Sequence, residues 1–102
     1  MWLFVFFDLP VLSRTERKAA AKFRKDLLKD GFQMMQYSVY VRFCVSAEKA
    51  DVHTRRVQRL LPKDGRVTIA RITDKQYESM LNFWGRMPQK PEAQGYQQLE
   101  LF

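Results

Sequence analysis

The chain has 102 residues, of which 46% are hydrophobic and 14% aromatic, and this is enough for one domain with a single core. It holds one cysteine, Cys44, and one histidine, His53, which excludes an intrachain disulfide framework and a zinc site made of Cys and His pairs, and makes a cytoplasmic location the default expectation. Lys and Arg total 18 against 11 Asp and Glu, so the net charge of +7 favours a polyanionic partner such as nucleic acid.

The N-terminal segment Trp2–Asp8 is predicted to be a strand covered on both sides, because both of its alternating faces are apolar. One face carries Trp2, Phe4, Phe6 and Asp8, and the other carries Leu3, Val5, Phe7 and Leu9. Pro10 ends the strand because it has no N–H to offer a sheet. The apolar run lacks a preceding basic region and is too short to span a bilayer, so we expect neither a signal peptide nor a membrane span.

A helix is predicted over Arg14–Lys29. Ser13 and Glu16 have the spacing of a capping box, and Asp30-Gly31 is typical of a helix end. The apolar face of this helix consists of Ala19, Ala20, Phe23 and Leu27.

Residues 34–45 alternate clearly and are predicted to form one long strand. One face would hold Met35, Tyr37, Val39, Val41, Phe43 and Val45, and the other would hold Gln36, Ser38, Tyr40, Arg42 and Cys44. We therefore expect Tyr37 to pack in the core.

The second half is expected to hold a helix over 47–61, a strand over 66–73 and a short helix that continues through Trp84. Ser46 would cap the first of these helices, and Thr73 with Gln76 would form a capping box for the second. We divide the chain into a domain over residues 1–84 and a C-terminal loop and strand over residues 85–102, with the last extended piece at 97–102.

This order of elements in so short a chain favours a ferredoxin-like α+β sandwich of the βαββαβ type. Two helices would cover one face of an antiparallel sheet, and a C-terminal strand would be added to it. The other face would hold the aromatic side chains of the first strand together with Asp8. Because so apolar a face needs a cover, we predict a homodimer through the open sheet face.

Five cations fall in one narrow stripe of the first helix, opposite its apolar face, and we call them the basic stripe: Arg14, Lys18, Lys22, Lys25 and Lys29. A solvated helix face usually mixes charges of both signs, but the only acids in this helix are Glu16 and Asp26. The pattern favours binding to the phosphates of a duplex, without sequence preference, over a purely solvated surface.

Asp8 has two interpretations. An Asp before Leu-Pro often accepts a turn hydrogen bond, which is a structural role. One carboxylate alone binds Mg²⁺ poorly, but a two-fold dimer could bring two copies of Asp8 together with water and a nucleic-acid phosphate, for metal-assisted phosphodiester hydrolysis. Ser38 and Tyr40, expected on the same sheet face, are candidates for positioning the substrate.

Several motifs, in order along residues 1–85, resemble the CRISPR-associated protein two family, especially its members from type II systems. They are Phe7-Asp8-Leu9-Pro10, Arg17-Lys18, Phe23-Arg24-Lys25, Gly31-Phe32, Gln36-Tyr37-Ser38-Val39-Tyr40, Leu61-Pro62, Gly65-x-Val67 and Ile72-Thr73-Asp74-Lys75-Gln76.

The resemblance implies a ferredoxin-like homodimer of CRISPR adaptation, which bridges two dimers of the integrase (CRISPR-associated protein one) and holds double-stranded prespacer DNA. It also implies an Mg²⁺-dependent endoribonuclease acting on single-stranded RNA, or on DNA in some members, with Asp8 as the catalytic and metal-binding residue. Family DNA contacts map onto Arg14, Arg17 and Lys18, and the basic stripe adds Lys22 and Lys25. The last strand would pair with the partner subunit or the integrase. An alternative is a toxin-type ribonuclease of the virulence-associated protein D kind, which shares the fold plan.

Overall fold

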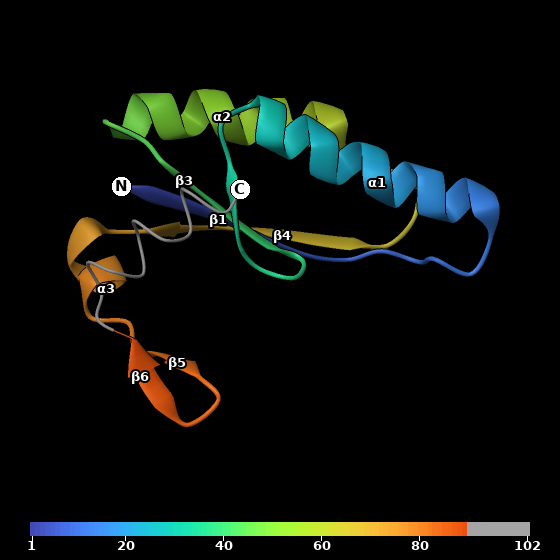
Figure 1. The fold of residues 1–102 in the computed structure, drawn as a ribbon. Helices are drawn as coiled ribbons and strands as arrows, with labels where there is room; N and C mark the ends of the chain where they lie inside the picture. Colours follow the sequence, from blue (N-terminus) through green and yellow to red (C-terminus); the bar gives the residue numbers. More distant parts are fainter. Residues whose placement is uncertain (90–102) are drawn as a thin grey trace.

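The computed structural model describes residues 1–89 of the chain (Figure 1). The elements follow one another in the order of a βαββαβ unit, and a short helix and a small hairpin come after it. They are β1 (Trp2–Asp8), α1 (Arg14–Lys29), β2 (Gln33–Gln36), β3 (Val39–Phe43), α2 (Ala47–Leu60), β4 (Arg66–Ile72), α3 (Asp74–Glu78), β5 (Asn82–Trp84) and β6 (Met87–Gln89).

The main sheet has the strand order β2-β3-β1-β4, and all of its neighbours are antiparallel. Helices α1 and α2 lie side by side on one face of this sheet (Figure 1). The central strand β1 is hydrogen-bonded on both edges, as its apolar sequence predicts. The ferredoxin-like α+β fold is therefore confirmed.

Both long helices begin where their caps predict. Ser13 Oγ accepts from the amide of Glu16 at 3.1 Å, and Glu16 Oε1 accepts from the amide of Ser13 at 2.8 Å, which completes the capping box of α1. Ser46 Oγ accepts from the amide of Lys49 at the start of α2. Each such cap contributes about 1 kcal/mol to the stability of its helix.

The core lies between the sheet and the two helices. Strand β1 contributes every second side chain to it, and the helices contribute residues at helical spacing. The buried members are Leu3, Val5, Phe7, Phe23, Leu27, Phe32, Tyr40, Cys44, Ala50 and Val57. Ala19, which was expected on the apolar face of α1, is instead exposed.

The prediction of one strand over residues 34–45 is wrong, because the segment is a hairpin with its turn at Tyr37 and Ser38. Ser38 has a φ of +66°, a left-handed conformation that residues other than glycine seldom adopt. The turn and a register shift at Met34–Gln36 break the expected alternation. As a result Tyr37 is 75% exposed, not packed in the core.

The second sheet face is partly covered by α3, a contact that the pattern of the sequence does not predict. The Tyr77 ring stacks on Trp2 with centroids 3.9 Å apart, and it meets the edge of Phe4, which is buried. Phe6, farther along the same face of β1, is still 39% exposed. The apolar face is thus covered in part at the Trp2 end of the strand and is open around Phe6 and around Phe43, the register partner of Trp2.

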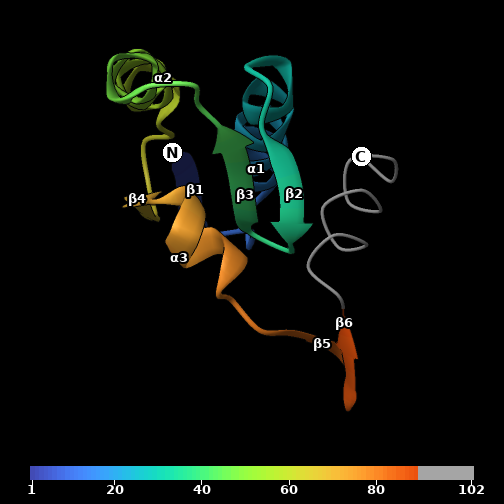
Figure 2. The ribbon, with the colours of Figure 1, turned by 90° about the vertical axis from the view of Figure 1, so that its left-hand side faces the viewer.

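Helix α3 starts at the predicted capping box but ends at Glu78, so its predicted continuation through Trp84 is wrong. Strands β5 and β6 instead form a hairpin that projects away from the main sheet (Figure 2). The domain boundary expected after residue 84 falls where the turn of this hairpin begins. The extended piece expected at 97–102 lies outside the described residues. No helix within residues 1–89 has the length and apolar character needed to cross a bilayer.

Candidate functional site

Asp8 lies at an open hollow of about 400 Å³ at the end of β1. The strand places it there because Phe7, one position earlier, is buried in the core while Asp8 is exposed on the opposite face. The polar side chains around the hollow come from three separate segments of the chain. They are Asp8, Tyr37, Ser38, Arg66 and Thr68.

Ser38 reaches this hollow because the β2–β3 turn is bonded directly to β1. The amide of Phe7 donates to the carbonyl oxygen of Ser38 at 3.1 Å. Ser38 Oγ accepts from Nη2 of Arg24 at 3.3 Å. The structure therefore brings two of the predicted site residues, Asp8 and Ser38, to one place.

Arg24 contacts residues of the site, although its position in the sequence does not predict this. Its guanidinium lies 4.6 Å from the ring centroid of Tyr37 and 5.3 Å from that of Phe7, in addition to bonding Ser38. Arg24 thus ties α1 to the turn beside Asp8. Periodicity marks it only as a cation flanking the apolar Phe23, because its partners come from a turn that the alternation conceals.

Tyr40 does not lie at the hollow, so the expectation that it shares a sheet face with Asp8 and Ser38 is wrong. It pairs with Val5 across β1 and β3, points to the helix-covered side and is 3% exposed. Burial raises the pKa of its hydroxyl, while the positive charge of Arg24 acts in the opposite direction. Tyr40 packs against Phe7 at 5.5 Å between ring centroids, so it supports the strand that carries Asp8.

The donor set for a metal is incomplete in a single chain. Within the described residues no group of three or more His, Cys, Asp or Glu side chains gathers in one place. Asp8 supplies one carboxylate, and Ser38 a hydroxyl that already accepts a hydrogen bond. Such a set suits Mg²⁺, which keeps several waters, only if a second carboxylate or a phosphate completes the shell.

Strand β4 brings a cation to the same hollow. Arg66, its first residue, is the register partner of Asp8 across the β1–β4 pair. Gly65 immediately before it has a φ of +98°, and a Cβ there would lie 2.8 Å from the carbonyl oxygen of Asp8. The chain can approach Asp8 this closely only because Gly65 has no side chain.

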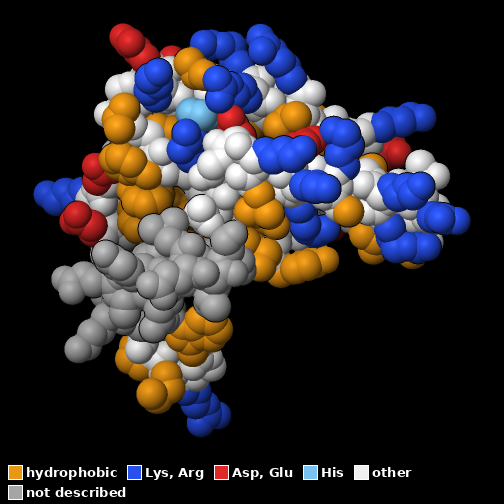
Figure 3. Space-filling view, turned by 45° about the horizontal axis from the view of Figure 1, so that its top comes forward, with side chains coloured by type: hydrophobic (Ala, Val, Ile, Leu, Met, Phe, Trp, Pro, Cys, Tyr) orange, Lys and Arg blue, Asp and Glu red, His pale blue; other side chains and the backbone are white. Residues whose placement is uncertain are grey.

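The basic stripe is exposed along α1, as expected, and Lys and Arg side chains gather over α1 and α2 in Figure 3. Its cations are not all free. Lys22 Nζ forms an ion pair with Asp26 at 2.6 Å, so one cation of the stripe is neutralised by an acid of the same helix. Arg17 donates from Nη1 to the carbonyl oxygens of Val11 and Leu12. Within residues 1–89, the side chains of Arg14, Lys18, Lys25 and Lys29 form no hydrogen bond or ion pair.

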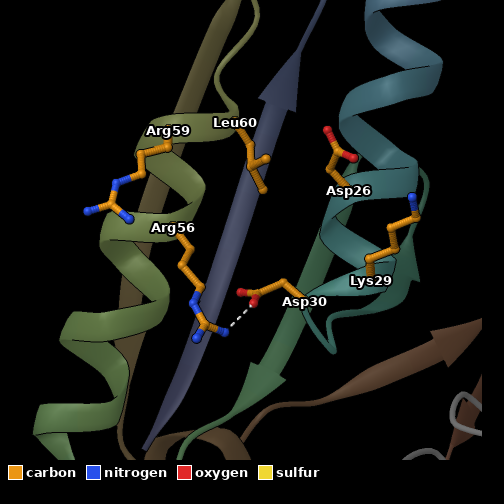
Figure 4. A pocket seen from close by; sticks show the side chains of 6 residues that line it. All are labelled: Asp26, Lys29, Asp30, Arg56, Arg59 and Leu60. Carbon is orange, nitrogen blue, oxygen red and sulfur yellow. Dashed lines mark hydrogen bonds and ion pairs between the residues drawn. The ribbon is translucent and has the colours of Figure 1, made fainter.

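A second hollow of about 400 Å³ lies between the C-terminal halves of α1 and α2 (Figure 4). Its central carboxylate, Asp30, is already engaged: Arg56 donates to Oδ1 at 2.9 Å, and Nδ1 of buried His53 lies 2.8 Å from Oδ2. This cluster braces the end of α1 against α2. It lies on the helix side of the sheet, whereas Asp8 lies on the opposite face.

Comparison with known proteins gives a consistent result. The profile of the family described as CRISPR associated protein Cas2 matches residues 1–80. Three curated proteins named CRISPR-associated endoribonuclease Cas2 align over all 102 residues of this chain. The protein from Flavobacterium psychrophilum is 51% identical with 88% of its length covered, that from Paracidovorax avenae 50% with 94%, and that from Parvibaculum lavamentivorans 48% with 100%.

Proposed function

The chain belongs to the Cas2 family of CRISPR-associated proteins, and on that premise we propose that it acts in CRISPR adaptation as a basic homodimer. The dimer bridges two dimers of the integrase and binds duplex prespacer DNA. The observation that carries this proposal is the exposed row of cations on α1 in a chain of net charge +7. The match over the whole chain favours this function over the toxin-type ribonuclease.

The homodimer is supported by two sets of exposed apolar side chains. Phe6 and Phe43 are exposed on the sheet face that α1 and α2 do not cover. Phe83, Trp84 and Met87 are exposed on the projecting hairpin. A monomer rarely leaves so many large apolar groups in water, and a second copy of the chain covers the sheet face without any other partner.

Duplex binding rests on the members of the basic stripe that have no partner in the described residues, Arg14, Lys18, Lys25 and Lys29. Because such contacts release counterions, affinity is expected to fall steeply with salt and to be insensitive to sequence. The test is electrophoretic mobility of a duplex with wild type and with Lys18→Glu/Lys25→Glu. Weaker binding and a shallower salt slope in the double variant are expected, and unchanged binding would remove the stripe from the proposal.

A metal-dependent endoribonuclease activity is the second part of the proposal, supported by the names of the relatives and by the exposed Asp8. Two copies of Asp8 in the dimer, with water and a substrate phosphate, would hold Mg²⁺. When bound there, the metal would supply an activated water and neutralise charge on the phosphate. Ser38 lines the same hollow and offers its hydroxyl to the substrate.

The nuclease test compares cleavage of single-stranded RNA and DNA in Mg²⁺ and in chelator, with wild type and Asp8→Asn. Loss of cleavage in the variant and in chelator is expected. Lys75→Gln is a suitable control, because Lys75 is an exposed cation on α3 away from the hollow. Cleavage that persists in Asp8→Asn would assign the activity to another site or to a contaminant, and the adaptor role would be unaffected. Co-purification with the integrase tests that role separately.

A further inference from the structure

Asp8 and Arg66 are direct neighbours across the β1–β4 pair, and both are exposed at the same hollow. Opposite charges in this position ordinarily attract each other into an ion pair. Asp8 and Arg66 form none, although five ion pairs occur elsewhere in the described part of the chain. Each of the two side chains therefore keeps its charge available to a ligand.

Arg66 differs in this respect from the other arginines near the sheet. Arg24 is bonded to Ser38, Arg71 to Asp51, and Arg42 to the carbonyl oxygen of Phe43. Arg66 has no hydrogen-bonding or ionic partner in the described structure. Its backbone, in contrast, is held firmly by the register with Asp8 and by the close approach of Gly65. It is a fixed cation with a free guanidinium.

The pairing of a free carboxylate with a free guanidinium selects the kind of ligand. A divalent cation alone would be attracted by Asp8 and repelled by Arg66. An anion alone would be attracted by Arg66 and repelled by Asp8. A metal ion bound together with a phosphate would satisfy both, because the carboxylate of Asp8 would hold the metal and the guanidinium of Arg66 would bind the phosphate.

We propose that Arg66 binds the phosphodiester of the nucleic acid at the Asp8 hollow, as the substrate-binding residue of that site. The inference rests on the proposed metal site at Asp8. It assigns the substrate contact to β4, on the opposite sheet face from the basic stripe. Binding of a duplex along α1 and engagement of one phosphodiester at the hollow are accordingly separable by mutation.

Metal binding by the full chain is the first measurement, with Mn²⁺ alone as the probe and electron paramagnetic resonance as the readout. Asp8→Asn should lose the Mn²⁺ signal of the site. Arg66→Gln should bind Mn²⁺ more tightly, by roughly twofold to tenfold, because a unit charge near the site contributes on the order of 1 kcal/mol in a solvated setting. Arg66→Lys keeps the charge and should match the wild type.

Binding of a single-stranded RNA 20-mer in the presence of Mn²⁺ is the second measurement. Arg66→Gln should weaken it by about tenfold or more, as expected for loss of a charge-assisted hydrogen bond. The slope of log affinity against log salt should fall by about 0.7 for the one phosphate lost. Arg66→Lys should retain the slope, and Lys75→Gln, which also removes one positive charge, should stay within about twofold of wild type.

The two measurements separate the possible failures. Unchanged Mn²⁺ binding in Asp8→Asn overturns the metal site and with it the premise of the inference. In a second outcome, Asp8→Asn loses Mn²⁺ binding but Arg66→Gln keeps the RNA affinity and the salt slope of wild type. That outcome overturns the role of Arg66 and leaves the metal site in place. Because Arg66 is exposed and its side chain has no partner among residues 1–89, its variants should unfold at the same temperature as wild type, which excludes a folding defect as the cause.

Discussion

Arg24 of α1 donates a hydrogen bond from Nη2 to Oγ of Ser38 at 3.3 Å, and Ser38 is the residue with a positive φ in the β2–β3 turn. The same guanidinium covers the ring of Tyr37, the other residue of that turn. A turn without glycine is thus held by a side chain from another element. This contact and the hydrogen bond from the amide of Phe7 to the carbonyl oxygen of Ser38 together fix where Ser38 lies relative to Asp8.

Replacing Arg24 with Met should loosen this turn and lower the free energy of unfolding by about 1–3 kcal/mol, because a charge-assisted hydrogen bond and two cation–π contacts are lost. Hydrogen exchange at the amide of Phe7, which donates to the Ser38 carbonyl, should accelerate. Lys25→Met, at the adjacent exposed position, is the matched control and should change neither quantity appreciably. Equal effects of the two variants would contradict the contact.

Gly65→Ala should destabilise the protein far more than Gly85→Ala. Gly65 has a φ of +98°, and a Cβ added there would lie 2.8 Å from the carbonyl oxygen of Asp8 and from Cδ2 of Leu9, so we expect a cost of about 2 kcal/mol or more. At Gly85 the φ of +59° is accessible to other residues and nothing lies within 4 Å, so about 1 kcal/mol is expected. Urea denaturation of the two variants measures the difference, and equal costs would argue against the close approach.

Phe6→Glu should convert the proposed dimer into a monomer, because it places a charge in the exposed apolar face. Light scattering after size exclusion should then report the chain mass of 12.2 kDa instead of twice that value. Leu12→Glu is the control, because Leu12 is 91% exposed and lies in the loop between β1 and α1, outside the strands of the sheet. A monomeric wild type, or a dimeric Phe6→Glu variant, would exclude this interface.

Stability should fall at alkaline pH because of Tyr40 and Tyr77. Burial raises the pKa of both hydroxyls above the ordinary value of 10.0, so the folded state retains protons that the unfolded state releases. Their contribution is complete below pH 10.0 and is lost as the pH rises through the folded pKa values. Unfolding curves at increasing pH should show the decline, and Tyr77→Phe should reduce it. If the stability of Tyr77→Phe falls with pH as steeply as that of wild type, Tyr77 does not contribute to the alkaline loss of stability.

Asp30→Asn should cost more stability than Asp26→Asn. Asp30 accepts from Arg56 and contacts buried His53, so its loss should lower the free energy of unfolding by about 1–3 kcal/mol. Asp26 pairs with Lys22, whose side chain is exposed, and such a pair contributes about 0.3–0.5 kcal/mol. Thermal unfolding of both variants checks the order, and the reverse order would contradict a bracing role for Asp30.

The site could be predicted only in part. The apolar strand that ends at Asp8 predicts the place of this carboxylate, and the structure puts Ser38 beside it at one hollow. The prediction of a single strand over residues 34–45 gives the wrong environment for Tyr40, which is buried, and for Tyr37, which is exposed. Arg66 could not be identified from the sequence, because its relation to Asp8 depends on pairing between strands that are distant in the chain.

The sequence by itself determined the features that depend on neighbouring residues. The starts of α1 and α3 follow from hydrogen bonds between residues three positions apart, and the two-sided burial of β1 follows from its continuous apolar composition. Tertiary structure decided what depends on long-range pairing: the turn at Ser38 held by Arg24, the cover of Trp2 by Tyr77, and Arg66 beside Asp8. Local preferences are too weak to specify those contacts, whereas strand register and helix packing specify all of them together.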